Sequence, residues 1–506
     1  MGAFNFDNMF TREAMAEFYS VAVREKRSLM QDIADGAYVS SDLTMGNEIE
    51  GSFVRQSDFQ LPQTEDFPNG VFNSVREIVK ERGGDLAAEL GDFDFEVNTR
   101  AKTLTGSVFR DEEKEIATKM AQVEAAAHQR GLTTLLSGLT ETARREDLVL
   151  AHLVQDEQKN HRYGGINQGV MRSRGGPIDI TIANHAHTPA FKNSFDHIMA
   201  EALCAALQTH IKLRDPALDF ARYMNASLIL AAPIIAASAS TPFVLGEGPL
   251  WADSRISVFE QSIDWRSPEV RSLESTPCNF PNRYYSNIGE FYGETLKIPV
   301  LIPDLSFGKN AAGKALIPSP SFRLMVGTDW RWVRPVWHQG NDEKRYMTLE
   351  FRPMSSGPTV VDMVANAALY LGAVHYLAEN SDPATKNPVI PYLAARNNFY
   401  VAARDGLDAL LFWRGRNMPA REVVRETLDF AKEGHALLGI DSSDSKRYLG
   451  IIEVRCCMGT PGDIKTAEYQ DYKQRNSDDR WGAMEQIVRA SHTALHRGIT
   501  LTLSGV

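Results

Sequence analysis

The chain has 506 residues, of which 24% are charged and 43% hydrophobic, a composition that excludes collagen, a disordered tail protein and a disulfide-stapled miniprotein. Its length predicts two or three structural units around a sizeable core. With 54 Lys and Arg against 65 Asp and Glu, the net charge is −11, and because no basic cluster offsets it, we expect neither a nucleic acid nor a membrane as a partner.

The first forty residues are predicted to be helical, with Thr11 as the N-cap and apolar residues set among charged ones. Acidic residues occur early and no apolar h-region follows, so this segment is not expected to be a signal peptide. A strand-like pattern then runs over residues 43–99, interrupted by a helical stretch at 75–82. A charged helix is expected over 112–131.

Residues 160–355 mix short alternating strands with helices such as 195–207, and beyond Thr359 the pattern is helical almost to the end. Thr359 and Asp362 form a T-x-x-D capping box before an apolar run. The most apolar stretch, Leu228–Ala239, is shorter than the ~20 residues that span a bilayer and is expected to be a core helix or buried connector. Further helices are expected at 398–413, 420–438 and 479–497.

We expect an α+β protein with three parts in one compact unit: an N-terminal helical segment (1–40), a catalytic sheet domain (41–358) and a helical C-terminal part (359–506) packed on the same unit. The four Cys, at positions 204, 278, 456 and 457, match neither a disulfide framework nor a CxxC motif. This usage indicates a reducing compartment, so we expect a cytoplasmic protein.

One apparent nucleotide motif does not hold. Gly308–Lys314 reads G-x-x-x-x-G-K, the start of a phosphate-binding P-loop. Ala315 follows, where that loop needs Ser or Thr, and Pro318 and Pro320 exclude the regular helix that must come next. Any nucleotide must therefore be bound in another way.

Four short segments alternate strictly between apolar and polar residues, as strands with one polar face do. On each segment the polar face carries side chains that can bind metal or phosphate. Glu89 lies seven residues before the second of these segments. The four polar faces comprise Glu48 and Glu50; Asp94, Glu96 and Asn98; Gln208, His210 and Lys212; and Thr348, Glu350 and Arg352.

Each face taken alone could be the solvated side of an antiparallel sheet. Glutamates are depleted in strands, however, and adjacent carboxylates on one face repel each other. If the four faces line one concave surface, divalent cations would neutralise them, and carboxylates with one imidazole suit Mg²⁺ or Mn²⁺. Mg²⁺ shares its shell with phosphate oxygens, so such a surface could bind ATP. The H-x-H pair of His185 and His187 is more typical of a turn than of a metal site.

Together these segments resemble the glutamate–cysteine ligase family in its second, bacterial and plant-like branch, carboxylate–amine ligases related to glutamine synthetase. The likeness runs from about Met45 to Leu411. It is carried by the order and spacing of motifs that are each short: Gly46-Asn47-Glu48-Ile49-Glu50, Glu89-Leu90, Glu96-Val97-Asn98-Thr99, Gln208-Thr209-His210, Asp329-Trp330-Arg331-Trp332-Val333-Arg334-Pro335, Leu349-Glu350-Phe351-Arg352 and Asn398–Leu407.

The resemblance implies a curved, mostly antiparallel sheet of the glutamine synthetase type, surrounded by helices, whose inner face holds two or three Mg²⁺ ions and ATP. Arg352 and Arg334 would face the transferred phosphate, and Arg255 would help to hold the amino-acid substrate. The implied metal ligands are Glu48, Glu50, Glu89, Glu96, His210 and Glu350. The chain departs from the family at Ser240-Thr241-Pro242, where Asn-Ser-Pro is usual, and at Asp94, where Gln is common.

The implied activity is an ATP-dependent ligase that joins the γ-carboxyl of L-glutamate to the amine of L-cysteine, or of a related amino acid, through a γ-glutamyl phosphate, releasing ADP and phosphate. With cysteine as acceptor, this reaction belongs to glutathione biosynthesis. The partners are then small molecules: ATP, L-glutamate and an amino-acid amine. Three alternatives stay open: a γ-glutamyl ligase for a non-cysteine amine, a metal-dependent hydrolase, and a non-catalytic relative.

Overall fold

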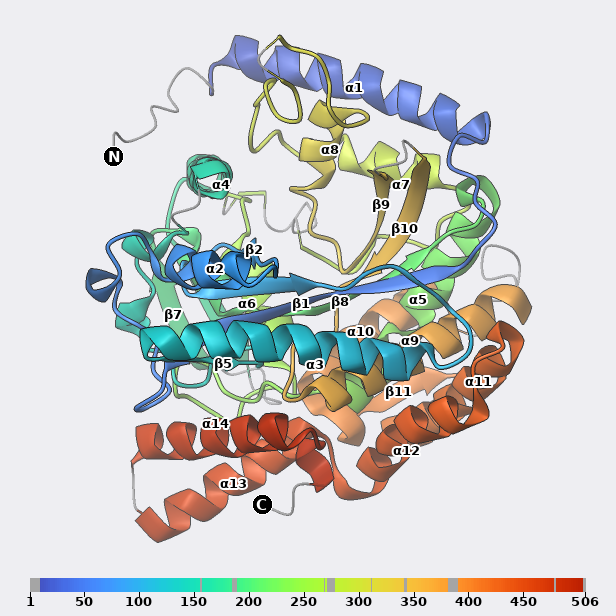
Figure 1. Ribbon diagram of the computed structural model, residues 1–506. Coiled ribbons are helices and arrows are strands. Elements are labelled where there is room, and N and C mark those ends of the chain that lie inside the picture. Colours follow the sequence, from blue (N-terminus) through green and yellow to red (C-terminus); the bar gives the residue numbers. More distant parts are fainter. Residues whose placement is uncertain are drawn as a thin grey trace.

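An antiparallel sheet that curls on itself forms the centre of the protein (Figure 1). The structure is a computed structural model that describes residues 10–154, 157–183, 189–267, 269–270, 278–310, 312–340, 344–380, 390–476 and 479–503. Within these residues the central sheet has eight strands, which are β1 (Thr44–Arg55), β2 (Ala87–Ala88), β3 (Asp94–Asn98), β4 (Lys102–Thr103), β5 (Leu132–Leu135), β8 (Leu207–Lys212), β9 (Val333–Gln339) and β10 (Arg345–Phe351).

The strands run in the order β2-β3-β1-β8-β10-β9, and β4 and β5 also pair with the long strand β1. Every one of these pairings is antiparallel. In Figure 1 strand β1 runs across the middle of the molecule while β9 and β10 rise steeply from it, so the sheet has a concave side. All four segments predicted from their alternation are strands of this one sheet.

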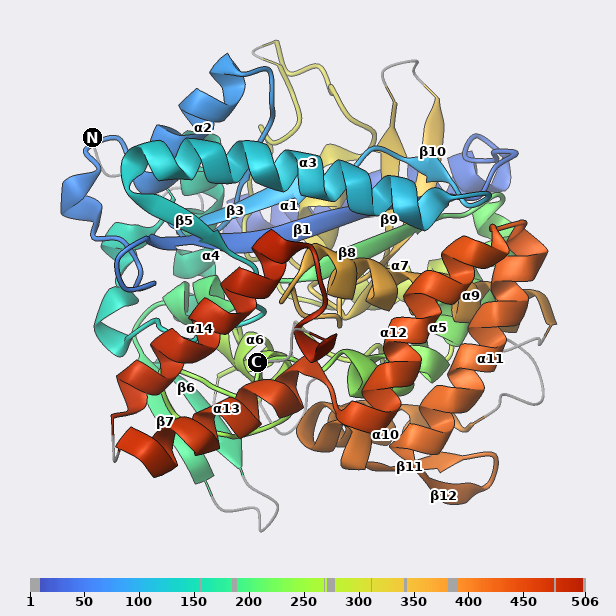
Figure 2. The same ribbon diagram turned by 60° about the horizontal axis from the view of Figure 1, so that its bottom comes forward.

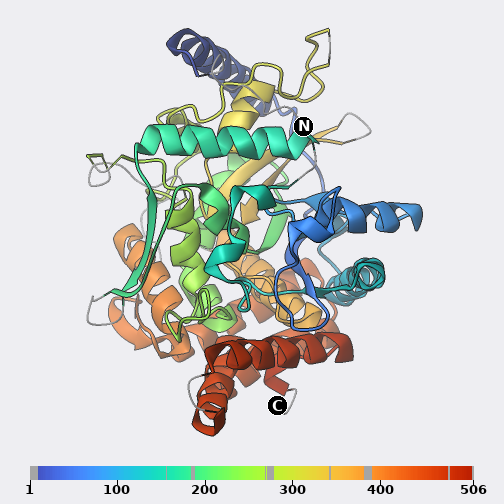
Figure 3. The same ribbon diagram turned by 90° about the vertical axis from the view of Figure 1, so that its left-hand side faces the viewer.

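Helices cover both sides of the sheet. Its convex side buries Ile49, Ile211, Leu349 and Phe351, and the Phe351 ring stacks on Tyr370 of α9 with 4.1 Å between centroids. The C-terminal helices lie on this side and α4 lies on the other (Figures 1 and 3). The helices of the convex side are α3 (Val108–Ala127), α5 (Pro216–Ser238), α9 (Val360–Asn380), α10 (Tyr392–Asp405), α11 (Ala420–Leu438) and α12 (Ser442–Met458).

The concave side is closed by elements that are less regular. Helix α1 packs on α8, and α1 begins where predicted, because the Thr11 hydroxyl accepts a hydrogen bond from the Ala14 N–H at 3.2 Å. Gly308–Lys314 leads into no helix before α8 starts at Pro320, as the rejection of a P-loop requires. The remaining helices of this part of the chain are α1 (Arg12–Ala34), α4 (Glu157–Arg174), α6 (Ser254–Ser262) and α8 (Pro320–Val326), together with α2 (Val71–Glu81), which packs on α3, and α7 (Ile288–Thr295), which packs on α5 and α8.

Helices α5 and α9 are apolar around most of their circumference because they lie inside the molecule. Both are long and apolar enough to cross a membrane, but 94% of each apolar window is buried, as in the core helix of a globular protein. Thr359 accepts a hydrogen bond from the Asp362 N–H at 3.2 Å, which confirms the predicted cap of α9. Leu228–Ala239 falls within α5 apart from its last residue, and is a core helix as predicted.

The predicted helix at 195–207 is wrong. Strand β7 (Pro189–Phe195) ends there and the 3₁₀ helix η5 (Ile198–Leu203) follows, after which β8 begins. The reason lies upstream, where β6 (Ile178–Ala183) pairs with β7 in a separate hairpin and buries alternate isoleucines. The apolar run that suggested a helix therefore belongs to the end of a hairpin and a short connecting turn.

The predicted helix at 398–413 is right only in its first half. Helix α10 ends at Asp405 because Gly406 adopts a positive φ of 56°, which stops the helix. Strand β11 (Leu410–Trp413) then pairs with β12 (Arg416–Pro419), so the C-terminal part contains a hairpin besides its helices. The other two C-terminal predictions are confirmed as α11 and α14 (Arg480–Arg497), the latter packing on α13 (Pro461–Asn476). The α+β class with a curved antiparallel sheet is confirmed.

Candidate active site

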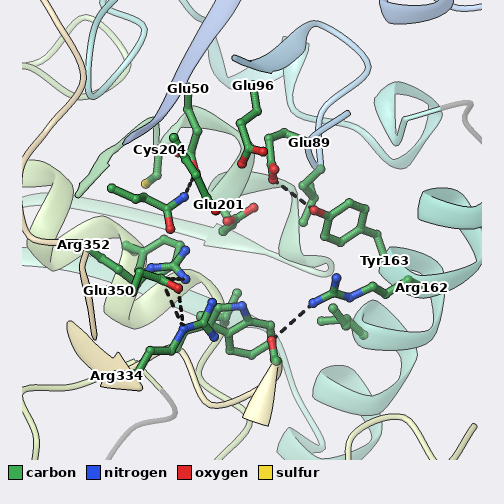
Figure 4. Close-up of a pocket in the computed structure, with 18 of the residues that line it drawn as sticks. Glu50, Glu89, Glu96, Arg162, Tyr163, Glu201, Cys204, Arg334, Glu350 and Arg352 are labelled. Atoms are coloured by element: carbon green, nitrogen blue, oxygen red, sulfur yellow. Dashed lines mark hydrogen bonds and ion pairs between the residues drawn. The ribbon is translucent and has the colours of Figure 1, made fainter. Parts of the chain in front are cut away.

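The polar faces of the predicted strands meet in one cavity of about 310 Å³ on the concave side of the sheet (Figure 4). Residues directly opposite each other in antiparallel strands share a face, so the register alone brings the predicted groups together. It sets Glu96 opposite Glu50, and it sets His210 opposite Glu350. Of the polar-face residues, Asn98, Lys212 and Thr348 do not line the cavity. The nine residues to which the family resemblance gives a role all line it, namely Glu48, Glu50, Glu89, Glu96, His210, Arg255, Arg334, Glu350 and Arg352.

One end of the cavity concentrates negative charge. Glu50, Glu89 and Glu96 each offer a carboxylate oxygen, and these oxygens all lie within 4.8 Å of one another. Burial and then the neighbouring Glu89 raise the pKa of Glu50 to about 8, although Arg352 and Arg255 lower it. The pKa of Glu96 is also raised well above its usual value, first by burial and then by the nearby carboxylates, Glu48 foremost. The protein holds these groups close at an electrostatic cost that a cation would remove.

Hydrogen bonds fix the carboxylates in this arrangement. The backbone N–H of Ala206 donates to Glu50 Oε2 at 2.6 Å, and the Gln208 amide donates to the other oxygen of Glu50. Asn98 donates to Glu96 Oε1 at 2.7 Å. Both oxygens of Glu50 therefore accept hydrogen bonds within the protein, whereas among the described residues Glu96 accepts a single side-chain bond, on Oε1.

The other end of the cavity concentrates positive charge around one carboxylate. Arg334 donates from Nε to both oxygens of Glu350, at 3.2 and 3.1 Å, and Arg352 Nη1 lies 2.9 Å from Glu350 Oε1. Burial by itself would raise the pKa of Glu350, but the two arginines outweigh it and lower the pKa to about 2. Glu350 is thus fully ionised and holds both guanidinium groups at the cavity wall.

His210 lies between these two ends. Its Nδ1 is 3.1 Å from the Thr348 hydroxyl, and its Nε2 is 3.3 Å from Glu48 Oε1 without forming a hydrogen bond of good geometry. Burial would lower the pKa of His210, but Glu48 and then Glu350 raise it above its usual value. A buried imidazole nitrogen that has no hydrogen-bond partner and faces a carboxylate can act, together with that carboxylate, as a ligand of a metal ion.

Arg255 enters the cavity from α6 and is almost completely buried. Its guanidinium donates to the backbone carbonyls of Arg352, at 3.1 Å, and Pro353, at 3.3 Å. It thereby supports the end of strand β10 as well as lining the cavity.

Sequence reasoning missed the residues that form the opposite wall. Arg162 and Tyr163 come from α4, and the Tyr163 hydroxyl donates to Glu89 Oε2 at 3.0 Å (Figure 4). Glu201 comes from η5, and burial together with Glu89 raises its pKa to about 8. Neither element carries a strand-like alternation that could have marked these residues. His185 and His187 lie outside the described residues.

The donor set suits a hard divalent cation. Clustered carboxylate oxygens are the ligands that Mg²⁺ and Mn²⁺ take in proteins, and Mg²⁺ is usually bound together with phosphate groups. The raised pKa values of Glu50 and Glu96 show that the cluster is electrostatically unbalanced by itself. Arginines at the far end provide the planar donors that recognise phosphate.

Comparisons with known proteins agree with this geometry. The model of glutamate–cysteine ligase family 2 matches residues 44–459, which is most of the chain. The search of curated proteins found no sequence that matches this chain. The fold is similar to a glutamate–cysteine ligase from Francisella tularensis, solved in complex with AMP, at 10% sequence identity and a TM-score of 0.53, covering 92% of this chain and 97% of that one.

Two further solved structures are similar at TM-scores of 0.43 and 0.39. They are a bifunctional glutathione synthetase from Pasteurella multocida (11% identity, covering 91% of this chain and 54% of that one) and the ligase PafA in complex with the ubiquitin-like protein Pup (11% identity, covering 88% and 72%). At these scores they add no argument. The match to the family model decides the identification: the chain belongs to glutamate–cysteine ligase family 2 and is an ATP-dependent carboxylate–amine ligase.

Proposed function

We propose that the protein joins the γ-carboxyl of L-glutamate to the amine of L-cysteine or a related amino acid. The observation that carries this proposal is the row of side chains across the sheet, with clustered carboxylates at one end of the cavity and two arginines held by Glu350 at the other. A negatively charged end that needs cations, facing a positively charged end, suits the polyphosphate of ATP and a carboxylate substrate between them.

The metal-binding part falls to Glu48, Glu50, Glu89, Glu96 and His210, which would hold two or three Mg²⁺ ions together with Glu350, whose oxygens would then be shared between a cation and the two arginines. When bound, Mg²⁺ neutralises phosphate charge and aligns the transferred group with its acceptor. The hydrogen bonds to Glu50 and Glu96 keep these carboxylates in place, and the Tyr163 hydroxyl does the same for Glu89. Preorganised ligands lower the cost of ordering the site when substrate arrives.

The first chemical step activates the carboxylate. A γ-carboxylate oxygen of glutamate attacks the γ-phosphorus of ATP, the bond from that phosphorus to the β–γ bridging oxygen breaks, and ADP leaves with the electron pair. Arg352 and Arg334 face the cavity and stabilise the charge on the phosphoryl group during its transfer. Because both guanidinium groups are already fixed by Glu350, little reorganisation is needed at that moment.

The second step forms the amide bond. The amine nitrogen attacks the acyl carbon of the γ-glutamyl phosphate, the carbon–oxygen bond to phosphate breaks with its electron pair going to the phosphate, and the proton lost by the nitrogen passes to the departing phosphate. This chemistry needs no nucleophilic side chain. Arg255 would hold the amino-acid substrate, which its position on the cavity wall allows.

The experiment incubates the protein with Mg²⁺, ATP and L-glutamate and measures ADP release with a panel of amines. We expect release that depends on glutamate and on one class of amine, with a γ-glutamyl amide as product by mass spectrometry. A preferred amine other than cysteine would replace the acceptor and keep the chemistry. Activity that persists without nucleotide would indicate a hydrolase, and no release with any amine would refute both ligase assignments.

A further inference from the structure

A second cluster of metal-ligating side chains lies away from the catalytic cavity, where α14 meets α3 and β5 (Figure 2). His492 and His496 are four residues apart on α14, and Glu124 on the last turn of α3 is four residues before His128, the residue that caps α3. Residues at this spacing share a helix face, so each helix presents a pair of ligands to the other. None of these residues lines the catalytic cavity.

The distances among three of these groups are those of a coordination site. His496 Nε2 lies 3.0 Å from His492 Nε2 and 3.4 Å from Glu124 Oε1, and His492 Nε2 lies 3.6 Å from the same oxygen. Ligands bound at 2.0–2.1 Å around a tetrahedral zinc ion are about 3.3 Å from each other. The three atoms thus form one face of a tetrahedron around a common point, before any ion is bound.

The protonation that this geometry permits also favours a ligand role. At 3.0 Å the two Nε2 atoms face each other, and they cannot both carry a proton. The Thr133 hydroxyl, which donates to Glu124, lies 2.7 Å from His492 Nε2 and accepts from it, so His496 Nε2 is the nitrogen that presents a lone pair toward the cluster and His492 gives up its proton when a cation binds. Two neutral imidazoles and one carboxylate form the ligand set of many zinc sites.

The carboxylate is oriented as a metal ligand would be. The backbone N–H of Thr134 donates to Glu124 Oε2 at 2.7 Å, and the Thr134 hydroxyl donates to the same oxygen. These bonds turn Oε1 toward the histidines, while His128 Nε2 lies 2.7 Å from Oε1 and the Thr133 hydroxyl also donates to it. Such outer partners, which fix the orientation of a ligand, are typical of metal sites.

We propose that Glu124, His492 and His496 bind one transition-metal ion, with Zn²⁺ the best match to their chemistry. The side chain of Glu124 is 9% exposed, that of His492 20% and that of His496 44%, so the site opens to solvent and leaves a fourth position for water or His128. Imidazole ligands distinguish this site from the all-oxygen carboxylate cluster of the cavity, which suits harder ions.

The ion would fasten the C-terminal helix to the sheet. Thr133 and Thr134 lie on β5, which pairs with Phe53 and Val54 of β1, the same strand that carries Glu48 and Glu50. A bond from α14 to α3 at this point therefore joins parts of the chain that are far apart in sequence and steadies the strand behind the catalytic cavity. Metal binding then contributes to folding stability, as it does in structural zinc sites.

The test measures metal binding by the full chain after treatment with a chelator, in excess Mg²⁺ so that the acidic cavity is filled. Zn²⁺ is titrated against a chromophoric chelator, and Co²⁺ is followed by its visible absorption, which is intense only for tetrahedral sites. We expect one Zn²⁺ per chain, a tetrahedral Co²⁺ spectrum and a thermal midpoint that rises with Zn²⁺. His496→Gln should weaken Zn²⁺ binding about 100-fold, as should the independent variant His492→Gln.

Two controls separate this site from others. Glu485→Gln removes an exposed carboxylate of α14 that bonds Arg489, and it should leave Zn²⁺ binding unchanged. Glu96→Gln alters the catalytic cluster and should also leave it unchanged, whatever happens to ligase activity. Failure of the wild-type protein to take Zn²⁺ from the chelator, or equal uptake by His496→Gln, would overturn the proposal and leave a hydrogen-bonded histidine cluster.

Discussion

Replacing Glu96 by glutamine separates the stability of the cavity from its function. Glu96 Oε1 accepts from Asn98, which a glutamine carbonyl can also do, so the change mainly removes a group that can ionise. Two charges 4.8 Å apart repel by about 3 kcal/mol at an effective dielectric constant of 20. Because the raised pKa values of Glu96 and Glu50 mean that the cluster already holds protons, we expect Glu96→Gln to stabilise the metal-free protein by about 1–3 kcal/mol.

The same substitution should lower ligase activity by about 10²-fold or more, because in the proposed function Glu96 is a ligand of the ions that neutralise phosphate. Urea unfolding in the presence of EDTA measures the first effect, and ADP release with saturating substrates measures the second. Wild-type protein should gain stability on addition of Mg²⁺, and the variant should gain much less.

The matched control is Glu115→Gln on α3. Glu115 pairs with Lys102 and lies 2.9 Å from Lys119, and although burial opposes them, these lysines lower its pKa to about 2. Neutralising this carboxylate should destabilise the protein by about 1 kcal/mol and leave activity unchanged. A Glu96→Gln protein that is less stable than wild type without metal, yet turns over at the parent rate, would refute the assignment of the carboxylate cluster.

Three further predictions address other parts of the molecule. Arg352→Lys should lower kcat about 10²–10³-fold and change the KM for glutamate less, because in the proposed function lysine cannot reproduce the planar donors beside the phosphoryl group. An increase in KM as large as the decrease in kcat would argue against this role. Arg455→Met should cost about 3–5 kcal/mol in urea unfolding, because the buried guanidinium lies 2.8 Å from Asp362 and the variant leaves that carboxylate uncompensated; an unchanged midpoint contradicts this account. Burial raises the pKa of Glu260 to about 7, although hydrogen bonds from Trp332 and Tyr400 lower it, so the wild-type protein loses stability as pH rises from about 4.5 to above 7. We expect Glu260→Gln to be more stable than the wild type by about 3 kcal/mol at pH 8 and equally stable below pH 4.5. Unfolding curves of both proteins across this pH range test the convergence.

Alternation along the chain was sufficient to predict the four strands of the central sheet that carry the polar faces, β1, β3, β8 and β10. A period of two residues assigns each polar side chain to one face of its strand. Once the strands pair in one sheet, Glu48, Glu96, His210 and Glu350 lie on the same surface. The pairing order could not be read in this way, because it depends on contacts between segments far apart in the sequence. The resemblance to a known family supplied what periodicity lacks, namely that the four faces belong to one cavity.

The opposite wall could not be predicted because its local sequence carries no regular pattern. Arg162 and Tyr163 lie on α4, whose polar and apolar residues are not segregated to two faces, and Glu201 lies on a short 3₁₀ turn. The error at 195–207 has the same origin, since an apolar run of that length reads equally well as a helix or as the end of a hairpin. In both places tertiary packing decides the structure.

The connectivity of the sheet governs when the protein can become active during its synthesis. The cavity combines side chains from position 48 to position 352, and β8 must settle between β1 and β10 before the two charged ends face each other. Such distant pairings close large loops and are slow to form. A ribosome-bound chain that ends before β10 lacks Glu350 and Arg352 and leaves the edge of β8 unpaired. Catalytic competence should therefore arise late, after most of the polypeptide has emerged, and chaperone dependence during expression is the practical consequence.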